Sequence, residues 1–219
     1  MLMRQLVLAT RNKGKIAEFE RMLNAYSSNI QVLGLADFPD LPDVDETGST
    51  FIENSLLKAR EVSAFTQLPA LADDSGLCID ALNGDPGIFS ARWAGVHGDD
   101  AANIAKVLAQ LSELASAGKL TNRNAKFRCA VALCFPSGHR RSTLEVLEEF
   151  EVNEVIEEGE LLGSITLAPR GTAGFGYDPI FQPNGYELTL GEFEHGEKDR
   201  TSHRAQALAK IAPKITSLI

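Results

Sequence analysis

Residues 5–23 of the chain read QLVLATRNKGKIAEFERML, and this stretch is the clearest guide to the fold. Its first five residues form a short, largely apolar run that predicts a β-strand. Four apolar residues between Ile16 and Leu23 then recur at the three- and four-residue spacing of one helical face. The stretch is therefore expected to form a strand, a turn and a helix, the repeating pattern of an α/β protein.

The rest of the chain continues this alternation. Thr50, with Glu53 three residues later, forms a capping-box pattern that predicts a helix reaching to about Phe65. The run 143–155 is expected to pair as a hairpin with the strand before it. The full set of further elements is strands at 70–72, 127–135, 143–155 and 161–167, a loop at 83–98, and helices at 101–117 and 202–215. The expected fold class is α/β, with a central mixed β-sheet flanked by helices, in a single domain over residues 1–219.

The composition indicates a globular protein with a sizeable core. The chain has 219 residues, of which 44% are hydrophobic, and a formal net charge of −9. This acidity argues against a protein that coats nucleic acid, because such proteins carry broad basic surfaces. Cys78, Cys129 and Cys134 lack zinc or redox spacing and are expected to be reduced core thiols. No run of about twenty apolar residues predicts a membrane span, so we expect a cytoplasmic protein without a membrane partner.

Asp73 and Asp74 follow the predicted strand 70–72 directly and are the first candidates for catalysis. We expect them in an acidic turn that ends at Gly76. Adjacent carboxylates repel each other unless a cation or proton lies between them, and a hard divalent cation such as Mg²⁺ would meet this need. Asp45 and Glu46 could add further carboxylate oxygens. The alternative is a structural turn in which one aspartate caps backbone amides.

The turn Thr10-Arg11-Asn12-Lys13-Gly14-Lys15 places three cations where a helix is expected to begin. The helix dipole disfavours positive charge there, so an anion is expected to offset them. Helix-start N–H groups, the Thr10 hydroxyl, the Asn12 amide and Lys15 could form a phosphate cradle, although the spacing is not that of a Walker A loop. The alternative is a solvated basic turn with Asn12 as a helix cap.

Lys58 lies one helical turn after Asn54, on the polar side of the second predicted helix. By itself it would be a solvated lysine. If the helix lies against the acidic turn, Lys58 could hold a phosphate oxygen or orient a carboxylate, and the spacing leaves these alternatives open.

Residues 171–178 read GTAGFGYD and could bind a flat ligand. The glycines let the backbone approach a base closely, and Phe175 or Tyr177 could stack on it. The alternative is a glycine-rich loop whose aromatic side chains enter the core.

A second group of cations, Lys198, Arg200, His203 and Arg204, surrounds the expected start of the last helix, with Ser202 as its N-cap. Cations are again out of place at a helix start. His203 and Arg204 could donate hydrogen bonds to a base carbonyl or to phosphate. The alternative is a basic surface patch.

Taken in order, these stretches resemble the inosine/xanthosine triphosphate pyrophosphatase family, the Ham1-like enzymes that act on non-canonical purine nucleotides. The resemblance extends over nearly the whole chain. The matching motifs are Leu8-Ala9-Thr10 with Asn12 and Lys15, Glu46-Thr47-Gly48, Phe51-Ile52-Glu53-Asn54, Lys58-Ala59-Arg60, Ala72-Asp73-Asp74-Ser75-Gly76-Leu77, Pro86-Gly87, Ser90-Ala91-Arg92, Gly174-Phe175-Gly176-Tyr177-Asp178-Pro179, Lys198 and Ser202-His203-Arg204.

The resemblance implies Mg²⁺-dependent hydrolysis of ITP, dITP or XTP between the α and β phosphates, to the monophosphate and pyrophosphate. It also implies an elongated fold of two lobes with a deep active-site cleft, and a homodimer. Asp74 would be the general base and, with Glu46, a Mg²⁺ ligand. Asp73, Lys15 and Lys58 would support catalysis. The nucleotide would be bound by Thr10 to Lys15 and by Ser75, Phe175, Gly176, Tyr177, Asp178, Lys198, His203 and Arg204.

Three features depart from the family pattern. Arg11 and Ala173 stand where small residues or glycine are common, and residues 143–158 are longer and more acidic than usual. Two other functions remain open: a Maf-like pyrophosphatase of modified pyrimidine nucleotides, and a nucleotide-binding protein without catalysis. His203 and Arg204 favour purines over pyrimidines, because both can donate to a 6-oxo group.

Overall fold

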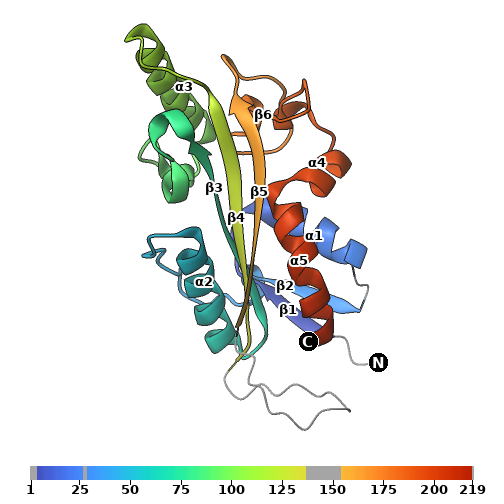
Figure 1. Cartoon of the computed structure of the whole chain (residues 1–219). Helices are drawn as coiled ribbons and strands as arrows, with labels where there is room; N and C mark the ends of the chain where they lie inside the picture. The colour runs from blue at the N-terminus through green and yellow to red at the C-terminus, as the bar shows by residue number, and fades with distance from the viewer. Residues whose placement is uncertain (1–3, 27–28, 137–153, 219) are drawn as a thin grey trace. The chain divides into compact units, whose positions relative to one another are not determined.

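The computed structural model describes residues 4–26, 29–136 and 154–218. Its strands form one six-stranded sheet in the order β2-β1-β3-β4-β5-β6 (Figure 1). β1 pairs in parallel with β2 and β3, whereas β5 and β6 are antiparallel, so the sheet is mixed. The strands are β1 (Arg4–Leu8), β2 (Ile30–Gly34), β3 (Ala70–Ile79), β4 (Asn124–Cys134), β5 (Glu154–Ile165) and β6 (Phe181–Pro183). The expected class, α/β with a mixed sheet flanked by helices, is confirmed.

The α-helices are α1 (Lys13–Tyr26), α2 (Phe51–Thr66), α3 (Asp100–Ser116), α4 (His195–Thr201) and α5 (His203–Leu218). Local chemistry explains where α2 begins, since the Thr50 side chain accepts a hydrogen bond from the Glu53 amide. The Glu53 carboxylate turns back and accepts from the Ser49 amide. Ser202 caps α5 as predicted, because its hydroxyl accepts from the Ala205 amide.

The chain divides into two compact units, each built from separate stretches of sequence. Unit 1 comprises Met1–Asp74, Ala130–Glu158 and Ala207–Ile219, and unit 2 comprises Ser75–Cys129 and Gly159–Gln206. The chain passes between them several times. The single domain over residues 1–219 stays a prediction.

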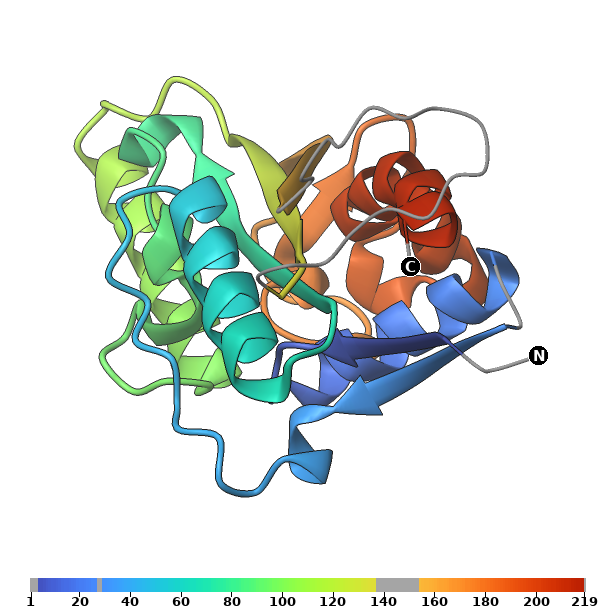
Figure 2. The same ribbon diagram turned by 90° about the horizontal axis from the view of Figure 1, so that it is seen from below.

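In unit 1, helices cover both faces of the sheet (Figures 1 and 2). α2 lies on one face, where Leu56, Ala59 and Val62 pack with β1 and β3 residues such as Val7 and Ala70. α1 and α5 lie on the other face. The sheet residues of unit 1 are therefore covered on both sides, which explains the three consecutive buried apolar residues Leu6, Val7 and Leu8 at the end of β1.

In unit 2, α3 contributes Val107 and Leu111 to a core that includes Leu77 of β3 and Phe127 of β4. Tyr177 also belongs to this core. Part of the glycine-rich segment 171–178 is thus fixed by hydrophobic packing.

One sequence prediction about a strand was wrong, and another was right in part. Asp73 and Asp74 do not lie in a turn after a strand, because β3 continues through them to Ile79. The strand expected at 161–167 is present over 161–165, as the C-terminal part of β5, which begins at Glu154. Most of the run expected to form a hairpin at 143–155 lies outside the described residues. The sequence analysis also missed β2, β6 and α4, which are short elements with weak periodicity.

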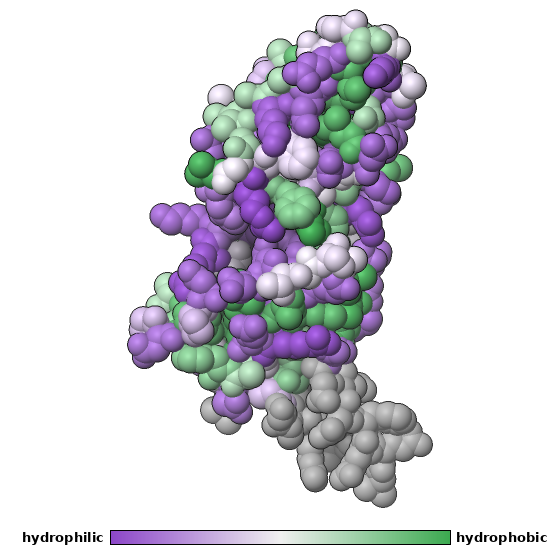
Figure 3. Space-filling model, turned by 90° about the vertical axis from the view of Figure 1, so that its left-hand side faces the viewer, coloured by the Kyte–Doolittle hydropathy of each residue, from purple (hydrophilic) through white to green (hydrophobic). Residues whose placement is uncertain are grey.

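Among the described residues, no helix has both the length and the apolar character that a bilayer span requires. On the face drawn in Figure 3, hydrophilic residues interrupt the hydrophobic ones. The cysteines are thiols: Cys129 and Cys134 are buried and Cys78 is partly exposed.

Candidate active site

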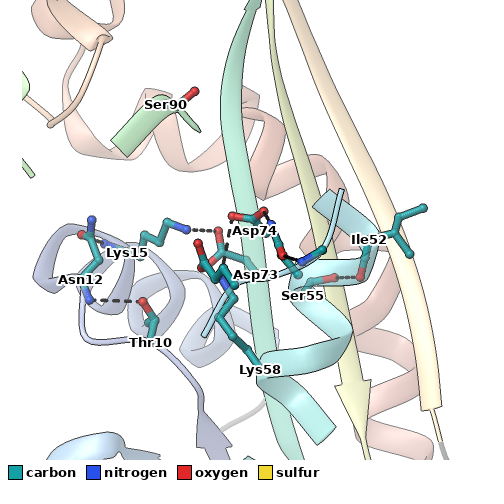
Figure 4. Close-up of polar contacts among 12 residues, drawn as sticks. Thr10, Asn12, Lys15, Ile52, Ser55, Lys58, Asp73, Asp74 and Ser90 are labelled. Atoms are coloured by element: carbon teal, nitrogen blue, oxygen red, sulfur yellow. Dashed lines mark hydrogen bonds and ion pairs between the residues drawn. The ribbon is translucent and has the colours of Figure 1, made fainter. Parts of the chain in front are cut away.

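Asp73 and Asp74 are neighbours on β3, and both are almost fully buried. Consecutive residues of a strand point to opposite faces of the sheet. Accordingly, Asp73 pairs with Lys15 of α1, whereas Asp74 contacts Asn54 and Lys58 of α2. The repulsion between the two carboxylates is thus reduced by two ammonium groups (Figure 4), each of which also acts on the other carboxylate.

Asp74 is held by an amide and an ammonium group. The Asn54 side-chain amide donates to its Oδ2 at 3.1 Å, and Lys58 Nζ lies 3.7 Å from its Oδ1. Burial raises the pKa of Asp74 above its ordinary value, although the positive charges of Lys58 and Lys15 partly oppose this. A buried carboxylate with a raised pKa is typical of a catalytic base.

Lys58 links Asp74 to Glu46. Its Nζ donates to Glu46 Oε1 at 2.5 Å. Burial alone would lower the pKa of Lys58, but the negative charges of Asp74, Glu46 and Asp73 outweigh burial and raise it. Lys58 therefore stays protonated and orients two carboxylates, one of the alternatives that its spacing left open.

Asn54 also fixes the segment that carries Glu46. Its Oδ1 accepts from the Gly48 amide at 2.8 Å, and its side chain is fully buried. A Cβ atom on Gly48 would lie 2.7 Å from this oxygen, so the close approach requires glycine. One buried amide thus ties the Glu46 segment to Asp74.

Lys15 extends from the first turn of α1, and its Nζ lies 2.9 Å from Asp73 Oδ2 (Figure 4). The Lys15 side chain is 13% exposed and that of Asp73 is fully buried. We call Glu46, Asp73, Asp74, Lys15 and Lys58 the acidic cluster. It sets three carboxylates against two ammonium groups, so one negative charge remains.

The proposed phosphate cradle at the start of α1 is ordered by its own side chains. Thr10 Oγ1 accepts from the Asn12 amide, and Asn12 Oδ1 caps the helix by accepting from the Lys15 amide. Arg11 turns away to Asp43, with Nε 2.6 Å from its Oδ1, and to the Leu41 carbonyl. The cations at this helix start are therefore partly offset by the protein's own carboxylates rather than only by a ligand.

The acidic cluster offers oxygen ligands suited to Mg²⁺. Glu46 and Asp74 converge on the same ammonium group, and their side chains are 25% and 8% exposed. Among the described residues, no group of three or more His, Cys, Asp or Glu side chains forms a complete metal site. Mg²⁺ commonly uses one or two carboxylates plus water and phosphate oxygens, so a pair of carboxylates fits this ion.

In unit 2, Asp178 organises the segment 171–178, which we call the glycine loop. Its Oδ2 accepts from the Phe175 amide at 2.9 Å and from Lys198 Nζ at 2.5 Å. A Cβ atom on Gly174 would lie 2.0 Å from this oxygen, and Gly174 has a φ of 77°. Asp178 and Lys198 form a buried ion pair that fixes the conformation of the loop.

The two aromatic residues of the glycine loop have different environments. Tyr177 is buried, and its hydroxyl donates to the Ser90 carbonyl at 2.9 Å. Phe175 is half-buried, with Lys198 Nζ 4.7 Å and Arg204 Cζ 5.1 Å from its ring centroid. Of the two, only Phe175 has an exposed ring surface on which a base could stack.

The sequence analysis expected all the basic residues near α5 to lie around the start of that helix, but only some of them do. Lys198 and Arg200 belong to the last turn of α4, where the helix dipole favours cations. His203 and Arg204 begin α5, and both are buried. His203 stacks on Phe127 with ring centroids 4.7 Å apart. Missing α4 was the cause of this error.

The sequence analysis did not predict a role for three other residues of the two sites. Asn54 was noted only as part of a motif. Ser90, whose hydroxyl accepts from the Leu77 amide, was treated likewise, and Asp100, which accepts from the Gly176 amide, was not singled out. The bonds of Ser90 to Leu77, of Asn54 to Asp74 and of Asp100 to Gly176 join residues 13 to 76 positions apart, so no local pattern indicates them.

The chain is similar to known proteins over nearly its whole length. A model of the Ham1 family matches residues 6–214. A dITP/XTP pyrophosphatase of Streptomyces avermitilis is 46% identical over 217 residues, which cover 99% of this chain and 100% of that protein. The structure of a HAM1 protein from Coxiella burnetii has a TM-score of 0.81 and 40% identity, covering 98% of this chain and 99% of that one. A dITP/XTP pyrophosphatase from Mycobacterium abscessus has a TM-score of 0.70 and 44% identity, covering 95% and 99%. The chain belongs to the Ham1 family.

Proposed function

We propose that this protein hydrolyses ITP, dITP and XTP between the α and β phosphates, releasing the nucleoside monophosphate and pyrophosphate. Such an activity would remove these nucleotides from the pool. Relatives that share 46% and 44% identity with the chain carry the name dITP/XTP pyrophosphatase. The observation that carries the proposal is the buried carboxylate of Asp74, held by Asn54 and Lys58 beside Glu46.

Asp74 would act as the general base. Its raised pKa gives the carboxylate a greater affinity for a proton from the attacking water than an exposed aspartate has. Lys58 and Asn54 would keep the carboxylate in place while the proton transfers to it. Asp73, through its ion pair with Lys15, would hold that ammonium group beside the start of α1.

Glu46 and Asp74 would hold Mg²⁺. When bound, the ion would neutralise negative charge that develops on phosphate oxygens. Lys15, Lys58 and the N–H groups at the start of α1 would bind the phosphates, together with Thr10, Asn12, Lys13 and Gly14.

The glycine loop and the start of α5 would recognise the base. Phe175 would stack on the purine, with Ser75, Gly176, Tyr177, Asp178 and Lys198 shaping or lining the nucleotide position. His203 and Arg204 would donate to the 6-oxo group of hypoxanthine or xanthine. Adenine presents an amino group there, which would leave those buried donors unpaired and so disfavour ATP.

The test is product analysis with ITP, XTP, dITP, GTP and ATP, each with Mg²⁺ or with EDTA. We expect monophosphate and pyrophosphate from the first three substrates in Mg²⁺, little from ATP, and none in EDTA. Orthophosphate as the sole phosphate product, or no turnover of any 6-oxopurine triphosphate, would contradict the proposal.

We also propose a homodimer in the cytoplasm. The support is the family membership alone. Sedimentation velocity would test the dimer, and cell fractionation would test the location.

A further inference from the structure

Two consecutive backbone amides of the glycine loop are held by carboxylates. The Phe175 amide donates to Asp178 at 2.9 Å, and the Gly176 amide donates to Asp100 Oδ2 at 2.7 Å. Asp178 belongs to the loop itself, whereas Asp100 lies on α3, 76 residues earlier. Asp100 is therefore a long-range anchor of the loop backbone, next to the one that the Tyr177 side chain makes with Ser90.

The backbone around Phe175 needs such an anchor. Gly174 and Gly176, on either side of Phe175, have φ values of 77° and 61°. Glycine has the most conformational freedom to lose on folding, so the bonds and packing of the neighbouring residues must hold a phenylalanine that lies between two glycines. Hydrogen bonds to charged acceptors are stronger than neutral ones. Loss of the bond to Asp100 would remove the side-chain bond at Gly176 and leave the buried Tyr177 as the next fixed residue.

Asp100 is not required to begin α3. The N-cap of this helix is Asp99, whose Oδ1 accepts from the Ala102 amide at 3.0 Å. The neighbouring carboxylate of Asp100 instead reaches the glycine loop. Asp100 also acts on Tyr177 of the loop: burial raises the pKa of Tyr177, and the negative charge of Asp100 raises it further, to a smaller extent.

We propose that Asp100 is a positioning residue for base recognition, which holds the Gly176 amide so that the ring of Phe175 keeps its place beside Lys198 and Arg204. This inference rests on the proposed function, in which Phe175 stacks on the purine. Asp100 touches neither the reacting phosphates nor the acidic cluster in this scheme. Its loss therefore weakens binding of the base and leaves the chemical step intact.

The experiment compares Asp100→Ala and Asp100→Asn with the matched control Asp99→Ala. Each variant and the wild type are assayed for KM and kcat with ITP, for the Kd of IMP by calorimetry, and for inhibition by inorganic tripolyphosphate. Thermal unfolding is recorded for each. IMP reports on the base with a single phosphate, whereas tripolyphosphate reports on phosphate binding alone.

Asp100→Ala is expected to raise the KM for ITP and the Kd of IMP about tenfold, the effect of losing one charge-assisted hydrogen bond. The kcat and the inhibition by tripolyphosphate are expected to stay within about twofold of the wild type. Asp100→Asn keeps an oxygen acceptor for the Gly176 amide but loses the charge, so it is expected to restore part of the affinity. Asp99→Ala is expected to lower the unfolding temperature through loss of the cap while leaving KM unchanged.

Wild-type KM and IMP affinity in Asp100→Ala would overturn the role of Asp100 while the proposed function stands. An Asn variant as impaired as the Ala variant would also overturn it, because the charge rather than the anchored amide would then matter. A wild-type protein that does not turn over ITP would overturn the proposed function itself, and with it the inference.

Discussion

The acidic cluster of unit 1 and the glycine loop of unit 2 are built in different ways. In the acidic cluster, regular elements position the charges: β3 carries the aspartates, and α1 and α2 supply the lysines. In the glycine loop, carboxylates position an irregular backbone by accepting from its amides. The first arrangement is suited to charge stabilisation and proton transfer, and the second to holding one aromatic ring. Substitutions in the acidic cluster should therefore mainly lower kcat, whereas substitutions in the glycine loop should mainly raise KM.

The largest effect is expected for Asp74→Asn. The amide keeps the shape of the side chain but has neither the charge nor the basicity of the carboxylate, so kcat should fall by about a thousandfold while ITP still binds. Steady-state kinetics and calorimetry would measure both. Asp45→Asn, at an exposed carboxylate next to Glu46, is the control and should keep full activity. Near-normal turnover by Asp74→Asn would remove Asp74 from its role as base.

Lys58→Met should lower both activity and stability. It leaves the carboxylates of Glu46 and Asp74 without their shared ammonium group, and breaking a buried ion pair costs about 3 kcal/mol. If these carboxylates hold Mg²⁺, the ion should raise the unfolding temperature of this variant more than that of the wild type. Calorimetry with and without Mg²⁺ measures this, and Lys119→Met, at an exposed lysine outside both sites, is the control. Equal responses to Mg²⁺ would count against the metal site.

Gly174→Ala should impair the glycine loop but not the acidic cluster. Its Cβ would lie 2.0 Å from Asp178 Oδ2 at a φ of 77°, so the loop must shift, and we expect KM for ITP to rise at least about tenfold with little change in kcat. Gly185→Ala is the matched control, because its φ of 85° is also strained but its Cβ meets nothing within 4 Å and it lies outside the glycine loop. A rise in KM for Gly185→Ala as large as that for Gly174→Ala would contradict the role given to Asp178.

The titration of Asp74 tests the electrostatics of the acidic cluster directly. Burial raises its pKa above the ordinary 3.8, so the native state binds this proton more tightly than an exposed aspartate does. The ionised base is then lost as the pH falls through that raised pKa. Carboxyl NMR of the metal-free protein should give a midpoint above 3.8. The midpoint should be higher still in Lys58→Met, since Lys58 is the largest of the opposing causes. A midpoint at or below 3.8 would show that the lysines outweigh burial.

The smallest effect is expected for Arg11→Ser. The ion pair of Arg11 with Asp43 is exposed, with side chains 52% and 84% accessible, and such pairs contribute about 0 to 1 kcal/mol. Unfolding free energy and kcat should both change little, and denaturant unfolding with ITP kinetics would measure this. A kcat loss of more than about tenfold would indicate that Arg11 leaves Asp43 to bind phosphate.

Much of the fold followed from the sequence, because the helices with strong apolar periodicity and good caps were predictable from local pattern. Thr50 and Ser202 cap α2 and α5 as expected. The errors concern elements that lack such signals. Nothing local indicates that β3 continues through two aspartates, since their stability in a strand depends on lysines from two helices.

The sequence by itself determined the α/β class, the family resemblance and the residue types of the acidic cluster and the glycine loop. Only the tertiary structure decided how these residues are paired. Asp73 pairs with Lys15, whereas Asp74 and Glu46 share Lys58. The Gly176 amide donates to Asp100, which lies on a different element. The physical reason is that periodicity and capping act over a few neighbouring residues, whereas ion pairs and hydrogen bonds form between any groups that the packed elements bring together.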